Sequence, residues 1–167
     1  MKAVIFASGY GTRLGTLTNK VPKPMLKVGK PVLERLIDRL NLHGITEIII
    51  TTHYLPLVIT EGIKSRALYF YEDELLSQED KLRTLSKWLT EDFLVINGDT
   101  LTDLNYTDMI SFHKKGTITA AMDGWTCIGT WIYPPNFTQA TTRPYRPTRW
   151  TDIGSKDKLK EERAKYN

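Results

Sequence analysis

Residues 2–14, KAVIFASGYGTRL, place a short apolar segment directly before a loop that contains two glycines. The segment KAVIFA has the length and composition of a buried strand, and Gly9 and Gly11 let the chain turn tightly after it. Backbone N–H groups in such a loop can contact phosphate oxygens. The loop lacks a dinucleotide fingerprint, because Leu14 replaces the third glycine, and no P-loop lysine follows. These residues predict an anion-binding loop, with a plain turn as the alternative.

Beyond this loop, β-rich runs alternate with amphipathic ones, which is typical of βαβ units around a mostly parallel sheet. Strands are expected at 2–7, 46–51, 67–71, 93–96, 117–122 and 127–133, and helices at 31–44, 55–64, 78–90, 105–115 and 156–167. Residues 134–149 are interpreted as a polar connection. We therefore expect an α/β fold in which residues 1–167 form a single domain. Its sheet is Rossmann-like, mixed and mostly parallel, with helices on both faces, and residues 156–167 form a terminal helix.

Composition and charge exclude several classes of protein. Hydrophobic residues make up 41% of the 167 residues and charged residues 25%, which is globular rather than disordered. The single Cys127 excludes an internal disulfide, and no apolar run approaches the roughly 20 residues of a membrane span. The net charge of +4 comes from scattered residues, so it does not support nucleic-acid binding and is compatible with a small polyanion. We expect a soluble, cytoplasmic protein with no membrane contact.

Two further segments carry charge in constrained positions. Pro22 and Pro24 flank Lys23 and restrict its backbone, so a stiff segment presents this cation. Asp99 follows a compact apolar strand and a glycine that permits close approach. A triphosphate is usually accompanied by Mg²⁺, which one or two carboxylates hold. Asp99 is thus a candidate magnesium ligand, although Asn-Gly-Asp can also be a simple turn. The three histidines lie far apart, without zinc spacing.

The segments GYGTRL (9–14), VPKPML (21–26) and GKPVLERLI (29–37) together resemble the start of the sugar-phosphate nucleotidylyltransferases. The resemblance implies a compact nucleotidyltransferase domain of the nucleotide-diphospho-sugar transferase type. Its substrates would be a nucleoside triphosphate and a sugar 1-phosphate, and its cofactor Mg²⁺. Arg13 would hold the β- and γ-phosphates, Lys23 would stabilise the α-phosphate in the transition state, and the backbone around Ser8 and Gly9 would touch the base and ribose. Arg13, Lys23 and Asp99 are the expected catalytic residues.

The resemblance extends to the metal site and to the nucleotide. WTDIGS (150–155) resembles the Trp-x-Asp-Ile-Gly-Thr element of many family members, which implies Asp152 as a second magnesium ligand beside Asp99. Ser155 also fits the N-cap of the terminal helix, so the segment has a structural explanation as well. The residues expected to bind the nucleotide are Ala7, Ser8, Gly9, Gly11, Thr12, Arg13, Ser77, Gln78, Asn97 and Gly98.

Two departures from the family pattern leave alternatives open. Residues 74–80 carry bulky acidic and polar side chains where the family has glycines, so Ser77 and Gln78 either bond a base edge or cap the next helix. Residues 123–126 replace a longer excursion, so the acceptor pocket is smaller, more open or completed by another subunit of a homo-oligomer. The alternatives to the sugar-nucleotide enzyme are a non-catalytic nucleotide- or sugar-nucleotide-binding subunit and a cytidylyltransferase acting on a small phospho-alcohol. Candidate acceptor contacts are Trp125, Trp131, Tyr145, Arg143, Arg146 and Arg149.

Overall fold

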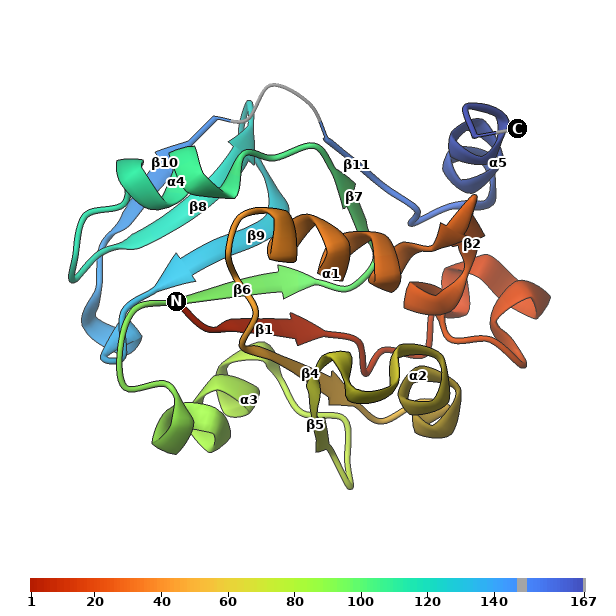
Figure 1. Ribbon diagram of the computed structural model, residues 1–167, viewed down its shortest axis with the longest axis horizontal. Coiled ribbons are helices and arrows are strands. Elements are labelled where there is room, and N and C mark those ends of the chain that lie inside the picture. Colours follow the sequence, from red (N-terminus) through yellow and green to blue (C-terminus); the bar gives the residue numbers. More distant parts are fainter. Residues whose placement is uncertain (147–149, 167) are drawn as a thin grey trace.

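The fold is an α/β arrangement around a mixed sheet (Figure 1). The structure is a computed structural model that describes residues 1–146 and 150–166, with only the backbone described for Trp150 and Asp152. The described residues form a seven-stranded sheet in the order β10-β8-β9-β6-β1-β4-β5. Its strands are β1 (Ala3–Phe6), β4 (Ile48–Thr52), β5 (Leu68–Tyr71), β6 (Phe93–Asn97), β8 (Ile118–Asp123), β9 (Thr126–Tyr133) and β10 (Thr142–Tyr145).

Among these seven strands, β9 alone runs against the others. β6, β1, β4 and β5 are parallel to one another, whereas β9 runs antiparallel to both β6 and β8. β10 pairs with β8 in parallel at the far edge. The carboxyl ends of β1 and β6 therefore meet at one rim, with Phe6 paired to Asn97. Ligands of open α/β sheets bind outside this rim.

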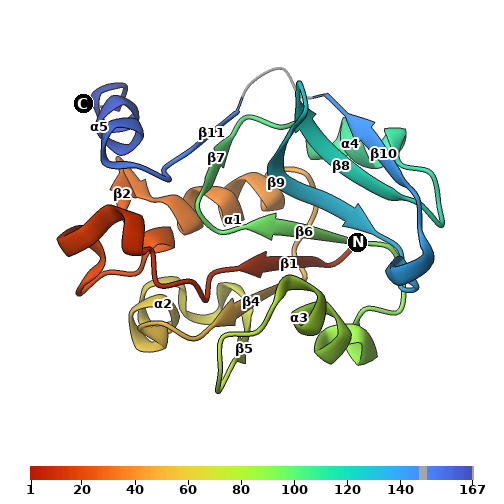
Figure 2. The same cartoon turned by 180° about the vertical axis from the view of Figure 1, so that it is seen from behind.

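Helices cover both faces of the sheet, as expected from the sequence. α1 (Val32–Leu42), α2 (Pro56–Ile63) and α4 (Tyr106–Phe112) lie on the face in front in Figure 1, and α3 (Gln78–Leu85) lies on the other face, seen in Figure 2. Alternation within the strands explains this, because successive side chains point to opposite faces. Ile5 of β1 packs in the α1 cluster, whereas its neighbour Val4 packs with Leu82 and Leu85 of α3.

A third, smaller cluster joins the two ends of the sequence. Leu14 packs with Leu26, Leu101, Ile153 and Leu159, all of them buried. Leu14 lies in η1 (Thr12–Thr18), Leu101 in β7 (Thr100–Thr102) and Leu159 in α5 (Lys156–Ala164), and Ile153 directly follows β11 (Trp150–Asp152). Leu26 lies between the 3-10 turn η2 (Lys23–Met25) and the β2 (Lys27–Val28)–β3 (Lys30–Pro31) hairpin. The remaining 3-10 turns are η3 (Lys64–Arg66), η4 (Ser86–Trp88) and η5 (Phe137–Gln139). The cluster fixes the glycine loop against the C-terminal segment.

Two parts of the sequence-based description need correction. Residues 134–149 are not only a polar connection, because Thr142–Tyr145 forms the edge strand β10. The predicted helix over 78–90 ends at Leu85 and continues as the 3-10 turn η4. The terminal helix begins at Lys156 as expected, and Ser155 caps it by accepting a hydrogen bond from the Lys158 N–H at 3.3 Å. No helix in the described ranges has both the length and the apolar character needed to cross a membrane.

Candidate functional site

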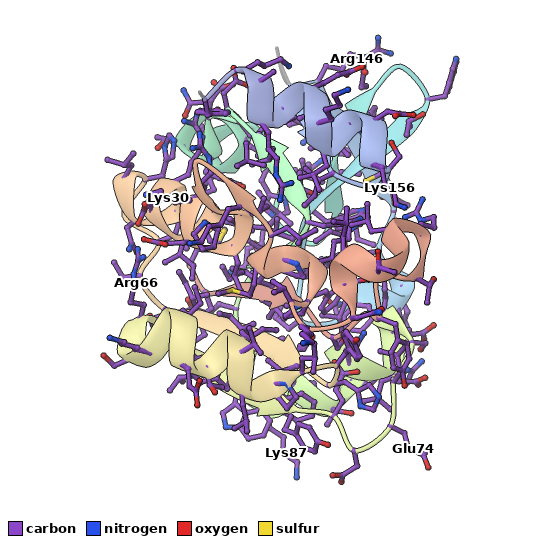
Figure 3. The ribbon with its side chains drawn as sticks, turned by 90° about the vertical axis from the view of Figure 1, so that its right-hand side faces the viewer. Lys30, Arg66, Glu74, Lys87, Arg146 and Lys156 are labelled. Carbon is purple, nitrogen blue, oxygen red and sulfur yellow. The ribbon has the colours of Figure 1, made fainter. Side chains whose placement is uncertain are left out.

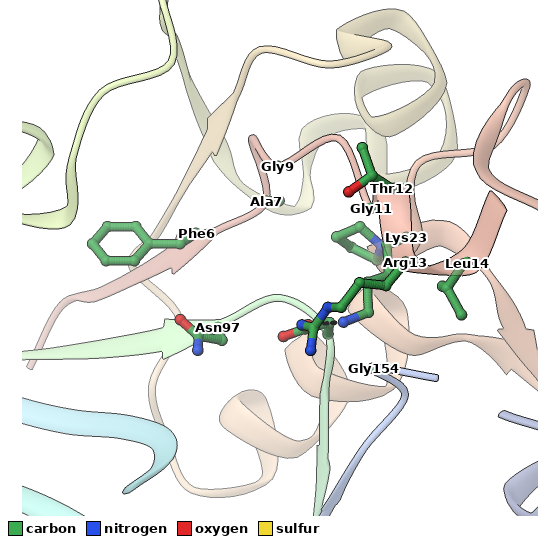
Figure 4. Close-up of a pocket in the computed structure, with 12 residues that line it drawn as sticks. Phe6, Ala7, Gly9, Gly11, Thr12, Arg13, Leu14, Lys23, Asn97 and Gly154 are labelled. Carbon is green, nitrogen blue, oxygen red and sulfur yellow. Dashed lines mark hydrogen bonds and ion pairs between the residues drawn. The ribbon is translucent and has the colours of Figure 1, made fainter. Parts of the chain in front are cut away.

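A cavity of about 270 Å³ opens at the rim where β1 and β6 end (Figure 4). Its walls come from the glycine loop, from η2, from the end of β6 and from the segment after β11. Most of the residues singled out in the sequence line it: Ala7, Gly9, Gly11, Thr12, Arg13, Lys23, Asn97 and Asp99. Phe6, Leu14, Pro24 and Gly154 complete the walls. The fold thus brings the separate motifs to one cavity.

Lys23 is held firmly and points into this cavity. The turn η2 closes through hydrogen bonds from the Met25 N–H to the Pro22 carbonyl at 2.8 Å and from the Leu26 N–H to the Lys23 carbonyl at 3.1 Å. Lys23 is 7% exposed, and its ammonium donates to Asp99 Oδ2 in an ion pair. The stiffness expected from the flanking prolines is therefore present, and it delivers the cation directly to the carboxylate.

Gly11 is required for the loop to pass over Lys23. Its φ of 68° lies in the left-handed region, and a Cβ at this position would stand 3.1 Å from Lys23 Cβ. Thr18 ties the loop together by donating a hydrogen bond to the Gly11 carbonyl at 3.2 Å and to the Gly15 carbonyl at 3.0 Å. Arg13 follows on an exposed turn, and it lines the same cavity as Lys23 (Figure 4). Two cations thus face one volume.

The acidic side of the site rests on close contact between β1 and β6. The Gly98 N–H donates to the Phe6 carbonyl at 2.9 Å, which fixes Asp99 beyond the end of β1. The β11–β7 ladder pairs Asp152 with Thr100, and the Ile153 N–H donates to the Asp99 carbonyl at 3.3 Å. The backbone of Asp152 therefore lies beside that of Asp99. The Asp152 side chain lies outside the described part of the chain, so its role as a ligand stays a prediction.

Some of the sequence-predicted residues lie outside the cavity walls. Ser8 is buried, and its hydroxyl has no hydrogen-bond partner among the described residues. Ser77 caps α3, because its Oγ accepts from the Asp80 N–H at 3.1 Å and donates to Asp80 Oδ2 at 2.6 Å. Gln78 is the first residue of that helix, and Gly98 is a spacer between Asn97 and Asp99. Of the two interpretations of Ser77, the structure displays the helix cap.

Three of the six candidate acceptor residues are engaged elsewhere. The Tyr145 hydroxyl donates to Asp108 Oδ2 at 2.6 Å, and burial together with this carboxylate raises the pKa of Tyr145 to about 12. Arg143 lies over the Phe112 ring and donates to the Phe112 carbonyl at 3.2 Å. Trp131 packs against Tyr133. Trp125 is 97% exposed on the β8–β9 turn and Arg146 is exposed, whereas Arg149 lies outside the described residues.

Sequence reasoning missed a buried ion pair behind the cavity wall. Glu72 and Lys81 have side chains that are 0% and 8% exposed, with Glu72 Oε2 3.5 Å from Lys81 Nζ. The Lys81 ammonium also lies 5.3 Å from the centre of the Phe6 ring, a residue that lines the cavity. The Leu76 N–H donates to Glu72 Oε2 at 3.0 Å. No sequence signal marked the pair, because both residues stand in a charged stretch that resembles a solvated surface.

Replacing Gly98 by alanine tests how tightly the acidic segment is fitted. A Cβ there would stand 3.0 Å from the Phe6 carbonyl oxygen and 3.3 Å from both Ile5 Cγ2 and Pro24 Cγ, and a strand backbone and a proline ring have little freedom to move. We expect Gly98→Ala to lower the free energy of unfolding by about 1–3 kcal/mol, measured by urea denaturation. Gly9→Ala is the matched control, because nothing lies within 4 Å of its added Cβ. Equal stability of the two variants would contradict the tight fit.

The site defines a class of protein: an α/β domain with a glycine loop, two cations and a carboxylate around one cavity at the strand ends. Comparison with known families identifies one family. The model of the nucleotidyl transferase family matches residues 2–136, and the chain belongs to this family.

Curated relatives and solved structures agree with this assignment. A mannose-1-phosphate guanyltransferase from Aspergillus oryzae is 31% identical over 152 residues, which cover 81% of this chain and 42% of that protein. A mannose-1-phosphate guanyltransferase beta-B from Xenopus laevis is 35% identical over 133 residues, covering 71% of this chain and 37% of that protein. The chain therefore spans less than half the length of these relatives. A crystal structure of HddC from Yersinia pseudotuberculosis complexed with GMP-PN shares the fold, with a TM-score of 0.85 at 21% identity and 99% of each chain covered.

Proposed function

We propose that this protein is a nucleotidylyltransferase that transfers a nucleoside monophosphate from a nucleoside triphosphate to a sugar 1-phosphate. An oxygen of the sugar phosphate attacks the α-phosphorus, the bond from that phosphorus to the bridging oxygen of the β-phosphate breaks, and pyrophosphate leaves with a nucleoside-diphosphate sugar as the other product. The observation that carries the proposal is the convergence of Arg13, Lys23 and Asp99 on one cavity walled by the glycine loop.

The cavity suits a reaction in which the protein supplies position and charge rather than a nucleophile. Gly9 and Gly11 present backbone to the cavity, Lys23 is preorganised for the α-phosphate, and Arg13 lines the cavity for the β- and γ-phosphates. Preorganised cations are effective because no reorganisation is needed when charge develops. Phe6 and Ala7 at the end of β1 offer a less polar wall for the nucleoside.

The donor groups at the acidic side fit Mg²⁺. Asp99 supplies a carboxylate, 26% exposed toward the cavity, and oxygen donors from a carboxylate and from phosphates are what this ion prefers. The described residues contain no group of three or more His, Cys, Asp or Glu side chains able to hold a metal alone, so substrate oxygens would complete the shell. We propose Asp99 and Asp152 as the protein ligands. When bound, Mg²⁺ would neutralise charge on the phosphate oxygens.

Pyrophosphate release tests the proposal directly. A panel of nucleoside triphosphates is combined with sugar 1-phosphates, with and without Mg²⁺. The names of the curated relatives make GTP with mannose 1-phosphate the first pair to try. We expect at least one pair to release pyrophosphate with added Mg²⁺ and none after chelation. A nucleotide at 100 times its dissociation constant should also add about 2.7 kcal/mol of stability. Nucleotide binding without product from any pair would contradict the enzyme and favour a non-catalytic binding subunit.

Substrate identity beyond these classes stays a prediction from the sequence, as do the cytoplasmic location and a homo-oligomeric state. The shortened turn Asp123–Thr126 between β8 and β9 leaves Trp125 projecting into solvent. This supports the proposal of an open acceptor side, for which sugar 1-phosphates of different sizes in the panel are the test.

A further inference from the structure

Lys156 lies against the outer side of the glycine loop. It is the first residue of α5, and Figure 3 shows it at the end of that helix nearest the 12–18 segment. A Cβ on Gly15 would stand 3.6 Å from Lys156 Nζ and 3.8 Å from its Cε. Gly15 has φ 59° and ψ −132°, a conformation that favours glycine. The Lys156 ammonium therefore lies close to the chain two residues beyond Arg13.

The fold itself gives Lys156 no ionic partner. Among the described residues, no hydrogen bond or ion pair satisfies its ammonium, and the side chain is exposed. A cation in the first turn of a helix is also unfavourable, because the free N–H groups there carry partial positive charge. Folding stability therefore does not account for a lysine at this position.

Lys156 also lies near the cavity, because the segment before it and the segment around Gly15 both contribute residues to the cavity wall. Gly154, two residues before it, lines the cavity, as do Arg13 and Leu14 just before Gly15. Burial of Leu14, Ile153 and Leu159 in one cluster holds these segments together. Within the cavity, Lys23 is already paired with Asp99, so Arg13 is the other lining cation. A polyphosphate extending outward past Arg13 would approach the Lys156 ammonium.

We propose that Lys156 is a further binding residue for the terminal phosphates of the triphosphate, and for pyrophosphate as it leaves. The inference rests on the proposed function. When the bond from the α-phosphorus to the bridging oxygen breaks, negative charge grows on the leaving pyrophosphate, and a third cation near it stabilises that charge. The exposure of Lys156 limits the effect, because water and salt screen its field.

Paired alanine variants test the inference. Lys156→Ala is compared with Lys160→Ala, which removes the same charge from an exposed position one turn further along α5. For the substrate pair found in the panel, we expect Lys156→Ala to raise the KM for the triphosphate about tenfold and Lys160→Ala to change it by less than about twofold. The dissociation constant of inorganic pyrophosphate with Mg²⁺, measured by calorimetry, should shift by a similar factor. Lys156→Arg should bring both the KM for the triphosphate and the dissociation constant of pyrophosphate close to the values of the parent protein.

The outcomes separate the inference from the function on which it rests. A larger effect of Lys156→Ala than of Lys160→Ala on both measurements, shrinking at high salt, supports the binding role. Equal effects in an active protein overturn the inference and leave the proposed function intact. A parent protein that neither turns over substrate nor binds pyrophosphate overturns both. The midpoint temperature of thermal unfolding of Lys156→Ala should match that of the parent protein. A loss of affinity could then not be attributed to a loss of folded protein.

Discussion

Lys23→Ala should reduce turnover roughly 10²- to 10³-fold while the protein remains folded. Lys23 is 7% exposed, stands between Pro22 and Pro24 at the start of the 3-10 turn η2, and lines the cavity. Because the Lys23 ammonium is already in position when charge develops on the α-phosphate, it stabilises the transition state without further movement. Its removal should therefore lower mainly kcat. The measurement is steady-state pyrophosphate release with the substrate pair identified for the parent protein.

The variant leaves Asp99 without its ion-pair partner, so folding must be checked separately. Asp99 is 26% exposed, and water can solvate the freed carboxylate, so we expect only a modest loss of stability in urea denaturation. Lys20→Ala provides a matched control, because Lys20 is an exposed lysine of the same connection. A turnover loss of less than tenfold in a folded Lys23→Ala protein would remove Lys23 from the proposed machinery.

Lys81→Met should destabilise the protein by about 3–5 kcal/mol. Methionine keeps an unbranched side chain of similar length but removes the ammonium, and so leaves the fully buried Glu72 carboxylate without its counter-charge. Glu72 Oε1 already lacks a hydrogen-bond partner among the described residues, so the Leu76 N–H on Oε2 would be left to stabilise the charge without a cation. Urea denaturation of the single variant measures the cost.

The double variant Lys81→Met with Glu72→Gln separates a charge effect from a packing effect. It removes both charges and keeps an acceptor for the Leu76 N–H, so we expect it to recover most of the stability lost in the single variant. If the double variant were as unstable as Lys81→Met alone, the loss would be due to packing around Phe6 rather than to the unpaired charge.

The strands that build the sheet centre could be predicted because their signals are local. AVIF and FLVIN are short apolar runs, and they form β1 and β6. The small strands were missed for physical reasons. Thr142–Tyr145 contains Pro144, which has no N–H to donate, yet a proline is tolerated on an edge strand such as β10. β7 has only three residues, and its pairing with β11 depends on contacts between distant parts of the chain.

The candidate site, like the fold, could be predicted only in part from the sequence. Motifs at Arg13, Lys23 and Asp99 could be predicted to gather because parallel strands end at one rim, and the structure places them in one cavity. The direct ion pair between Lys23 and Asp99 joins residues from distant segments, so it depends on how η2 is positioned relative to the end of β6. Lys81 and Lys156 stand in charged helical segments whose pattern indicates exposure, and pattern alone does not reveal which charges contact another segment.

The cluster around Leu14 has a consequence for how the protein is made. Leu14 is synthesised early and its partners Ile153 and Leu159 late, so the glycine loop lacks its supporting contacts while most of the chain is already outside the ribosome. Contacts between such distant positions also carry a high loop-closure cost and form slowly. The parallel strands and α1 can fold earlier from nearer segments, whereas the proposed nucleotide site is completed only once translation has delivered β11 and α5. A nascent chain arrested before Ile153 would therefore lack the packing that supports the glycine loop.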